Sequence, residues 1–419
     1  MGPVTSAGTR APAALYAAGF VTAFGAHAVA ASVGSEVGRD GLSLLALGVV
    51  LAVYDGAEVL LKPVFGSLAD RWGPRRVLLG GLVAFALVSG VYAVLATTGV
   101  VAASGAVVAL TLARLGQGAA ASAFSPAAGA MVGRLSAGGK QGRAFGSYGA
   151  WKGLGYTAGP ILGGVLVVLG GLPLLFATLG VLAAVVAVWV VVAVPVLDPL
   201  PRKRQTVVDL ARRLGSASFL RPTAALAATT AALSVGVGFL PVLGAAVGLG
   251  PVATGAVVAL LALTSTLVQP RAGRAHDRGE LGTRAALLLG FVPMVGGFVV
   301  AATVSGLAGI VPAAILVGLG VGVLTPVAFA TLAASSPPER LGQTMGSAEV
   351  GRELGDAGGP LLVGAVAAGA STGVGLVVLA GVLAVTGAAS LVRAGDGVRR
   401  DGTVGGAGEG GPEPEPDDR

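Results

Sequence analysis

The stretch KPVFGSLADRWGPRR, residues 62–76, closes an apolar run that begins near Leu44 and places Asp-Arg and Pro-Arg-Arg directly behind it. About 20 helical residues cross the hydrocarbon core of a bilayer, so these charges stand where a membrane helix would leave the lipid. A second stretch, QPRAGRAHDRGELGTR at residues 269–284, repeats the pattern. The two stretches share four residues at an offset of 207, about half the chain: Pro63 and Pro270, Gly66 and Gly273, Asp70 and Asp277, and Arg71 and Arg278.

The composition is that of an integral membrane protein. Of the 419 residues, 54% are hydrophobic and only 11% are charged, and the mean hydropathy is +0.86. Soluble domains carry about 25% charged residues. The chain has no cysteine, which excludes disulfides and thiol chemistry. The usage of Ala, Gly, Val and Arg is typical of a high-GC bacterial genome, so we expect a bacterial cytoplasmic (inner) membrane protein.

The apolar segments predict an all-α fold of twelve transmembrane helices in two pseudo-symmetric halves of six. The predicted spans are 12–33, 44–67, 77–97, 102–130, 145–169, 172–197, 222–246, 250–269, 285–304, 307–334, 345–369 and 373–392. They divide the chain into a tail (1–11), a first half (12–197), a linker (198–221), a second half (222–395) and a C-terminal tail (396–419). In the linker, TVVDLARRL has its apolar residues at helical spacing, which predicts a short helix on the membrane face. The polar C-terminal tail predicts disorder.

Lys and Arg alternate between the two sides of this topology. Only Arg39 is a basic loop residue on one side. The other side carries Arg71, Arg75, Arg76, Arg134, Lys140, Arg143, Arg202, Lys203, Arg204, Arg212, Arg213, Arg221, Arg271, Arg274, Arg278, Arg284 and Arg340. This asymmetry predicts that both termini are cytoplasmic. It also explains the net charge of +7 without a nucleic-acid partner.

GSLADRWGPRR resembles the loop motif of the major facilitator superfamily, Gly-x-Leu-Ala-Asp-Arg-x-Gly-x-Arg-Arg, and we expect it in the loop after the second span. The matching residues are Gly66, Leu68, Ala69, Asp70, Arg71, Gly73, Arg75 and Arg76. The copy at Gly273, Asp277 and Arg278 is degenerate, since Ala275-His276 replaces Leu-Ala. The resemblance implies that the aspartate engages a helix N-terminus of the opposite half, and glycine would allow a tight turn. A basic loop that only sets topology is the alternative, and the repeat at half-chain spacing argues against it.

A glycine pattern in the fifth span resembles that of drug–proton antiporters within this superfamily. It consists of Gly146, Gly155, Gly159, Pro160, Gly163 and Gly164. A partial copy at an offset of 200 comprises Gly346, Gly355, Gly359, Pro360 and Gly364. The structural alternative is close helix packing with a proline kink, and we expect the glycine face to let the two halves slide and seal. In the fourth span, LARLGQGAAASA resembles another superfamily motif, with Arg114 as its buried cation.

Ionisable side chains inside a membrane are costly and usually functional. Nine lie within the predicted spans: Asp55, Glu58, Lys62, Arg114, Lys152, Glu349, Arg352, Glu353 and Asp356. Glu58 and Glu353 lie at a similar depth, about 13 Å from the cytoplasmic end at the helical rise. The resembled fold places the second and eleventh spans side by side, so we expect a buried ionic cluster there. It is either a static salt-bridge network or a gate whose carboxylates bind protons when their cationic partners leave.

The leading functional hypothesis is proton-coupled efflux of small amphipathic molecules by alternating access. A proton-coupled importer of a small metabolite is the main alternative, and a non-transporting receptor is a third class that the loop motifs disfavour. The sequence lacks an ATP-binding Gly-x4-Gly-Lys-Ser/Thr loop, since Gln141 follows Gly139-Lys140. We expect no enzyme, cofactor or metal site, because no nucleophile–base or metal-ligand spacing occurs. The expected partners are a small-molecule substrate, protons and the lipid bilayer, and we expect a monomer.

We expect the first, fourth, seventh and tenth spans to line a central cavity. The candidate lining residues are Tyr16, Phe20, Phe24, His27, Arg114, Gln117, Phe239 and Phe329. Drug exporters of the resembled family often carry an acidic residue in the first span, and this chain offers only His27 there.

Overall fold

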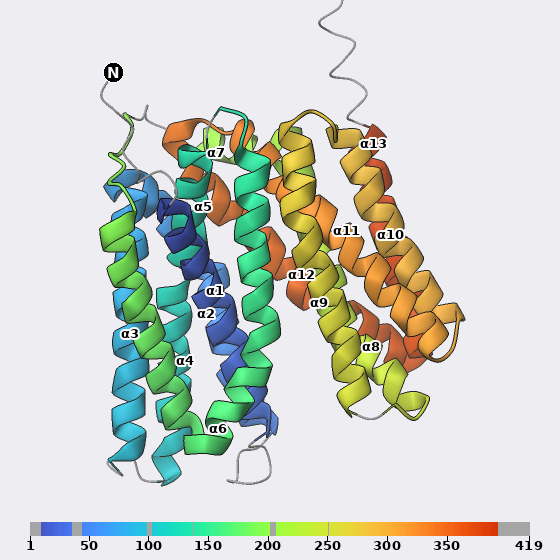
Figure 1. Cartoon of the computed structure of the whole chain (residues 1–419), viewed down its shortest axis with the longest axis horizontal. Helices are drawn as coiled ribbons and strands as arrows, with labels where there is room; N and C mark the ends of the chain where they lie inside the picture. The colour runs from blue at the N-terminus through green and yellow to red at the C-terminus, as the bar shows by residue number, and fades with distance from the viewer. Residues whose placement is uncertain are drawn as a thin grey trace, which may run out of the picture.

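The computed structural model describes residues 10–35, 44–98, 103–136, 138–201, 207–249 and 251–392. These residues form helices and connecting turns, with no strand among them. The helices are α1 (Arg10–Ser35), α2 (Leu44–Trp72), α3 (Pro74–Thr97), α4 (Ala103–Ala121), α5 (Phe124–Leu135), α6 (Gln141–Ala193), α7 (Val207–Leu214), α8 (Ala217–Ala246), α9 (Pro251–Asp277), α10 (Thr283–Thr303), α11 (Leu307–Ala334), α12 (Leu341–Gly369) and α13 (Thr372–Val392). In Figure 1, α1–α6 form one group of helices and α8–α13 a second group beside it.

Twelve membrane spans are formed by these helices. Nine helical segments of the described chain are long and apolar enough to cross a bilayer. One of them, α6, is two helices joined at Gly170 and Gly171, where Gly171 has a positive φ of 70°. The remaining two spans are α2 and α12, whose charged side chains lower their hydropathy. These observations confirm the predicted all-α membrane fold.

One predicted span is interrupted. The helix expected over 102–130 breaks at Ser122 and Ala123 into α4 and α5. The Ser122 hydroxyl donates a hydrogen bond to the Gly118 carbonyl at 2.7 Å and lies 3.3 Å from the Ala57 carbonyl of α2. Side-chain hydroxyls that bond to the helix backbone in this way commonly bend helices.

Several helices extend further than a bilayer core requires, which corrects the expected position of the loop motif. α2 continues to Trp72 and α9 to Asp277. Gly66, Asp70 and Gly273 are therefore helical rather than in loops. The tight turn falls at Gly73 instead, which has a φ of 91° and immediately precedes α3.

The two groups of helices meet along two seams. α2 packs against α12, and α6 packs against α9. We call the end of the molecule that bears α7 the basic end. The end of α5 and the starts of α6 and α12 lie there too, and next to them in the sequence are Arg134, Lys140 and Arg340. The start of α1 and the end of α13 lie at this end too, and the groups diverge away from it (Figure 1). Residues 1–9 and 393–419, together with Arg39, Arg202, Lys203 and Arg204, lie outside the described residues.

Candidate functional site

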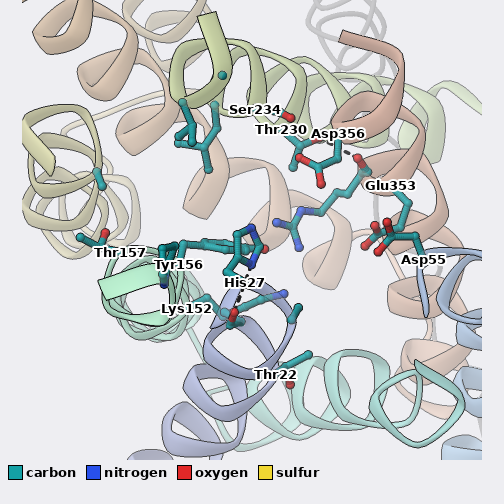
Figure 2. A pocket seen from close by; sticks show the side chains of 18 of the residues that line it. Thr22, His27, Asp55, Lys152, Tyr156, Thr157, Thr230, Ser234, Glu353 and Asp356 are labelled. Carbon is teal, nitrogen blue, oxygen red and sulfur yellow. Dashed lines mark hydrogen bonds between the residues drawn. The ribbon is translucent and has the colours of Figure 1, made fainter. Parts of the chain in front are cut away.

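A cavity of about 640 Å³ lies between the two groups of helices, on the side of the seams away from the basic end. Residues of six helices, α1, α2, α6, α8, α9 and α12, line it, and α5 contributes Ser125. Figure 2 shows that its polar side chains converge from both groups. They include Thr22, His27, Asp55, Lys152, Tyr156, Thr230, Ser234, Glu353 and Asp356. This differs from the prediction, since α2 and α6 contribute strongly and α11 does not.

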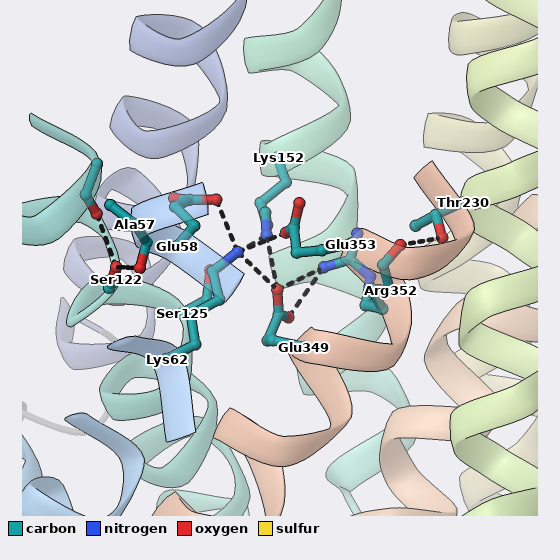
Figure 3. Close-up of polar contacts among 11 residues, drawn as sticks. Ala57, Glu58, Lys62, Ser122, Ser125, Lys152, Thr230, Glu349, Arg352 and Glu353 are labelled. Carbon is teal, nitrogen blue, oxygen red and sulfur yellow. Dashed lines mark hydrogen bonds and ion pairs between the residues drawn. The ribbon is translucent and has the colours of Figure 1, made fainter. Parts of the chain in front are cut away.

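Lys62 is the centre of an ion cluster at the basic end of the cavity. Its Nζ lies 2.7 Å from Glu58 Oε2, 2.5 Å from Glu353 Oε1 and 3.6 Å from Glu349 Oε2. The side chain is only 2% exposed. Glu58 is on the same helix as Lys62, whereas Glu349 and Glu353 belong to α12 of the opposite group (Figure 3). Lys62 therefore joins the two groups across one seam.

Glu349 is the second centre of this cluster. It accepts hydrogen bonds from Arg352 Nη1 at 2.9 and 3.1 Å, and its Oε2 lies 4.0 Å from Lys152 Nζ. Lys152 also donates to the Ser125 hydroxyl at 3.2 Å. The cluster thus links α2, α6 and α12, and it brings together the charged stripes that the sequence places on the second and eleventh spans. Buried charges of this kind must be paired, because an unpaired charge in a dry interior is costly.

Asp55 and Asp356 occupy a separate layer nearer the mouth of the cavity. Asp55 is seven residues from Lys62 along α2, and Asp356 is seven residues from Glu349 along α12, or about 10 Å at the helical rise. Both side chains are exposed to the cavity. Within the described part of the chain, neither carboxylate forms an ion pair.

His27 stands in the wall of the cavity. Its Nδ1 lies 3.1 Å from the carbonyl oxygen of Ala23, one turn earlier in α1. Its ring meets the Tyr156 ring edge-on, with 4.4 Å between centroids. The predicted first-span residue therefore does line the cavity, and its partner is an aromatic residue from within the glycine motif of α6.

Two aspartates close the seams at the basic end. The Asp70 carboxylate accepts hydrogen bonds from the backbone N–H groups of Gly342 and Gln343, both at 2.8 Å. The Asp277 carboxylate accepts from Gly142 and Arg143, both at 2.7 Å. These amides belong to the first turns of α12 and α6, where the helix dipole favours a negative charge. We call these two contacts the latches, and each has the geometry that the resemblance implies.

The basic residues of the loop motif lie around the first latch. Arg75 donates to the Val191 carbonyl at 2.5 Å, while Arg71 and Arg76 are exposed. In the second copy, Arg278 lies 3.6 Å from Glu280. Arg213 of α7 donates a hydrogen bond to the Thr344 hydroxyl, which ties the linker helix to the start of α12.

The glycine motif of α6 serves mainly to pack α6 against α1, which is in the same group of helices. A Cβ at Gly155 would lie 2.7 Å from the Phe20 carbonyl, and one at Gly163 would lie 2.8 Å from Ala28 Cβ. Gly159 approaches Ala28 in the same way, whereas a Cβ at Gly164 would have no neighbour within 4 Å among the described residues. Only Gly146 faces the opposite group, against the backbone of Gln269 in α9. The expectation that the whole glycine face forms the sliding surface is therefore wrong.

In the partial copy on α12, a single glycine again faces the opposite group. Gly346 packs on the Lys62 backbone. Gly355 and Gly359 approach α8 within their own group, at Ala227 and Ala231. Gly364 has only the Phe239 ring near it, at 3.9 Å.

Seven candidate cavity residues do not line this cavity: Tyr16, Phe20, Phe24, Arg114, Gln117, Phe239 and Phe329. Arg114 is 2% exposed, and its guanidinium sits 4.0 Å from the Tyr54 ring centroid, behind the wall. It donates to Gln117 at 3.3 Å, and Gln117 donates to Ser89 at 2.8 Å, so both belong to the interior of the first group. Tyr16 lies 6.4 Å from Tyr148 by ring centroids, and Phe24 is buried and stacked on Phe20.

Comparison with known proteins gives one family. A model of the Major Facilitator Superfamily matches residues 15–292 and 223–410. The class C tetracycline resistance protein of Escherichia coli is 36% identical over 121 residues, 28% of this chain and 28% of that protein. A multidrug resistance protein B homolog of Mycobacterium tuberculosis (strain H37Rv) is 36% identical over 105 residues, 25% of this chain and 19% of that protein. The match thus spans less than a third of the length of these relatives.

Solved structures share the whole fold. The human organic anion transporter MFSD10 (TETRAN) superposes with a TM-score of 0.70 at 18% identity, covering 93% of this chain and 100% of that one. FucP, a Major Facilitator Superfamily transporter in the outward conformation, superposes with a TM-score of 0.74 at 13% identity, covering 91% and 98%. At these identities the likeness is one of fold.

Proposed function

Because this chain belongs to the major facilitator superfamily, a family of membrane transporters, we propose that it exports small amphipathic molecules in exchange for protons by alternating access. The single observation that carries the proposal is the ion cluster around Lys62. It occupies the seam between the two groups of helices, at the closed end of the cavity. In this family of folds, transport proceeds by rocking one half against the other around a central site.

The cluster contains two kinds of ion pair. Lys62–Glu353, Lys62–Glu349 and Lys152–Glu349 cross between the groups, while Lys62–Glu58 and Arg352–Glu349 stay within one helix. Separation at the basic end must break the first kind and can spare the second. Lys62 is the only ion-pair partner of Glu353 in the described chain. Glu353 is thus the carboxylate that loses its cation when the two groups separate, whereas Glu58 and Glu349 each keep a partner on their own helix. A carboxylate without its cation binds a proton more readily.

The orientation that we propose rests on the basic residues, and the direction of transport rests on the similarity to resistance proteins. Positive charge on the α7 side favours a cytoplasmic basic end in the bacterial inner membrane, with both termini cytoplasmic. The cavity would then be closed to the cytoplasm by the two latches and the ion cluster. We further propose that a monomer acts alone, with residues 12–197 and 222–395 as its two moving halves. Similarity to proteins named for tetracycline and multidrug resistance supports efflux.

The test begins with a substrate identified by a toxicity and accumulation screen in an efflux-deficient bacterial host. The purified protein is then placed in liposomes that contain a pH-sensitive dye. Substrate moving one way should drive protons the other way. Glu353→Gln should lose this proton movement, while Glu280→Gln, a neutralised exposed carboxylate in the α9–α10 turn, should keep it.

Two results would contradict the proposal. Substrate and protons moving in the same direction would identify the importer alternative. Substrate movement without any proton movement in the unmodified protein would show that the ion cluster is a static network that only fixes the packing.

A further inference from the structure

The mouth layer of the cavity presents carboxylates without cations. Asp55 and Asp356 are exposed to the cavity, one from each group of helices (Figure 2). The Ser234 hydroxyl bonds to Asp356. No Lys, Arg or His nitrogen of the described residues lies within 4.0 Å of either carboxylate. A ligand that enters from the mouth therefore meets these two negative charges first.

The cations that line the cavity lie deeper, and each is held by carboxylates. Within the described residues, Lys62, Lys152 and Arg352 form ion pairs with Glu58, Glu349 and Glu353 alone. The deep layer is thus matched in charge, and it presents no spare cation to a ligand. The charge left over in the cavity is the negative charge of the mouth layer.

Two buried polar atoms in the same wall also lack partners. Among the described residues, the Tyr54 hydroxyl and Glu58 Oε1 have no hydrogen-bond partner, and these residues are only 1% and 6% exposed. Both residues line the cavity. A buried acceptor without a donor is destabilising, and a ligand N–H group would relieve that cost.

The remaining walls are aromatic and apolar. Tyr156 lies across the cavity from the acidic residues, and α8 and α9 supply Leu233, Val237 and Val258. Tyr156 and Asp356 stand at the same place in the two copies of the glycine motif, 200 residues apart. One copy thus offers an aromatic ring and the other a carboxylate, the two groups that bind organic cations best.

We infer that the cavity binds lipophilic organic cations, such as protonated amines, with Asp55 and Asp356 receiving the positive charge. This inference rests on the proposed transport function and names its substrate class. The negative charge of Asp55 is repelled by Glu58, Glu353 and Asp356 and is attracted by Arg114. The negative charge of Asp356 is repelled by Glu353 and is attracted by Arg352 and Lys62. A bound cation relieves the repulsion among the carboxylates, whereas a bound anion adds to it.

The test compares two probes of the same shape and opposite charge, tetraphenylphosphonium and tetraphenylborate. Equilibrium binding is measured on the full-length protein in detergent, at fixed pH and salt and without any gradient. We expect saturable binding of tetraphenylphosphonium only. Asp55→Asn and Asp356→Asn should each weaken it at least about tenfold, since each removes an attractive charge from a poorly solvated site. Asp55→Glu and Asp356→Glu should retain most of the affinity, and Glu280→Gln should retain all of it.

The comparison of the two probes on the unmodified protein needs no variant to fold. Equal or tighter binding of tetraphenylborate would overturn the inference, as would tetraphenylphosphonium binding that both Asn variants leave unchanged. Proton-coupled export of a neutral or anionic substrate in liposomes would then still uphold the proposed function. Conversely, charge-selective binding without coupled proton movement would uphold this inference and contradict the proposed coupling.

Discussion

Replacing Lys62 with Met should open the seam between α2 and α12. Met keeps most of the length and apolar volume of the Lys side chain but removes its charge. Lys62 contacts Glu58 and Glu353 at 2.7 and 2.5 Å and Glu349 at 3.6 Å, in a site that is 98% shielded from solvent. Removal of one partner from a buried ion pair costs about 3–5 kcal/mol. The lower figure corresponds to a change of roughly a hundredfold in an equilibrium constant.

This cost falls on the state that is closed at the basic end. When the groups separate, the stranded carboxylates reach water, so the open state is spared most of the penalty. The expected result is a population shift of up to about a hundredfold toward opening at the basic end. Adding Glu353→Gln should reverse part of the shift, because it removes one of the stranded charges.

A single cysteine at Met345 measures the shift. The natural chain has no cysteine. Met345 is 1% exposed and packs against Gly129 of α5 at the closed end. A maleimide should therefore alkylate Met345→Cys slowly, and faster when Lys62→Met is added. Lys140→Met, which neutralises an exposed lysine, is the matched control. An unchanged alkylation rate in the Lys62→Met background would refute the reasoning, since it would mean that the cluster does not hold the seam closed.

Three further predictions concern the latches, the glycine contact and Arg114. Asp70→Asn and Asp277→Asn should each weaken closure by about 1–2 kcal/mol, since each replaces a charged acceptor at a helix N-terminus; the same cysteine reporter measures both, and a variant with the wild-type alkylation rate would show that its latch is dispensable. Gly346→Val should abolish transport because Gly346 touches the Lys62 backbone, whereas Gly164→Val should be tolerated because it meets open space; equal transport rates in liposomes would contradict this. Arg114→Ala should abolish substrate-driven proton movement and Arg114→Lys should retain part of it, whereas full movement in both would reduce Arg114 to a packing residue.

The membrane fold was predictable because its determinants are local. Span length and the alternation of basic residues require no knowledge of which helices touch. The charged stripes were also visible, since residues three and four apart share a helix face. The same charges lower the hydropathy of α2 and α12, so a criterion based on apolar length alone misses these two spans. Charged residues such as Asp55 and Arg352 mark them instead.

The cavity wall could not be predicted from the sequence because helix rotation is set by packing. Helical spacing does not separate Phe24, which is stacked in the core, from His27, which faces the cavity one turn later. Gln117 is a polar residue in an apolar span, yet it does not face the cavity, because its side chain donates a hydrogen bond to Ser89 inside the first group of helices. The sequence analysis does not predict Tyr156 as a cavity residue, although it directly follows Gly155 of the glycine motif.

The two seams are related by the internal repeat but differ in charge. The offset of 207 that pairs Pro63 with Pro270 also pairs Lys62 with Gln269, and the offset of 200 pairs Glu353 with Gly153. Gln269 bonds within its own helix, to Ser265 at 3.2 Å, and lies against the glycines of α6. In the part of the chain that the structure describes, the latch thus occurs twice, whereas the buried ion cluster occurs once. A change in the protonation of this cluster therefore acts directly on the α2–α12 seam and, through the Lys152–Glu349 contact, on α6. It reaches α9 only through the packing of each group of helices. For this reason the response of the whole molecule to protons depends on how rigidly each group moves, as well as on the carboxylates themselves.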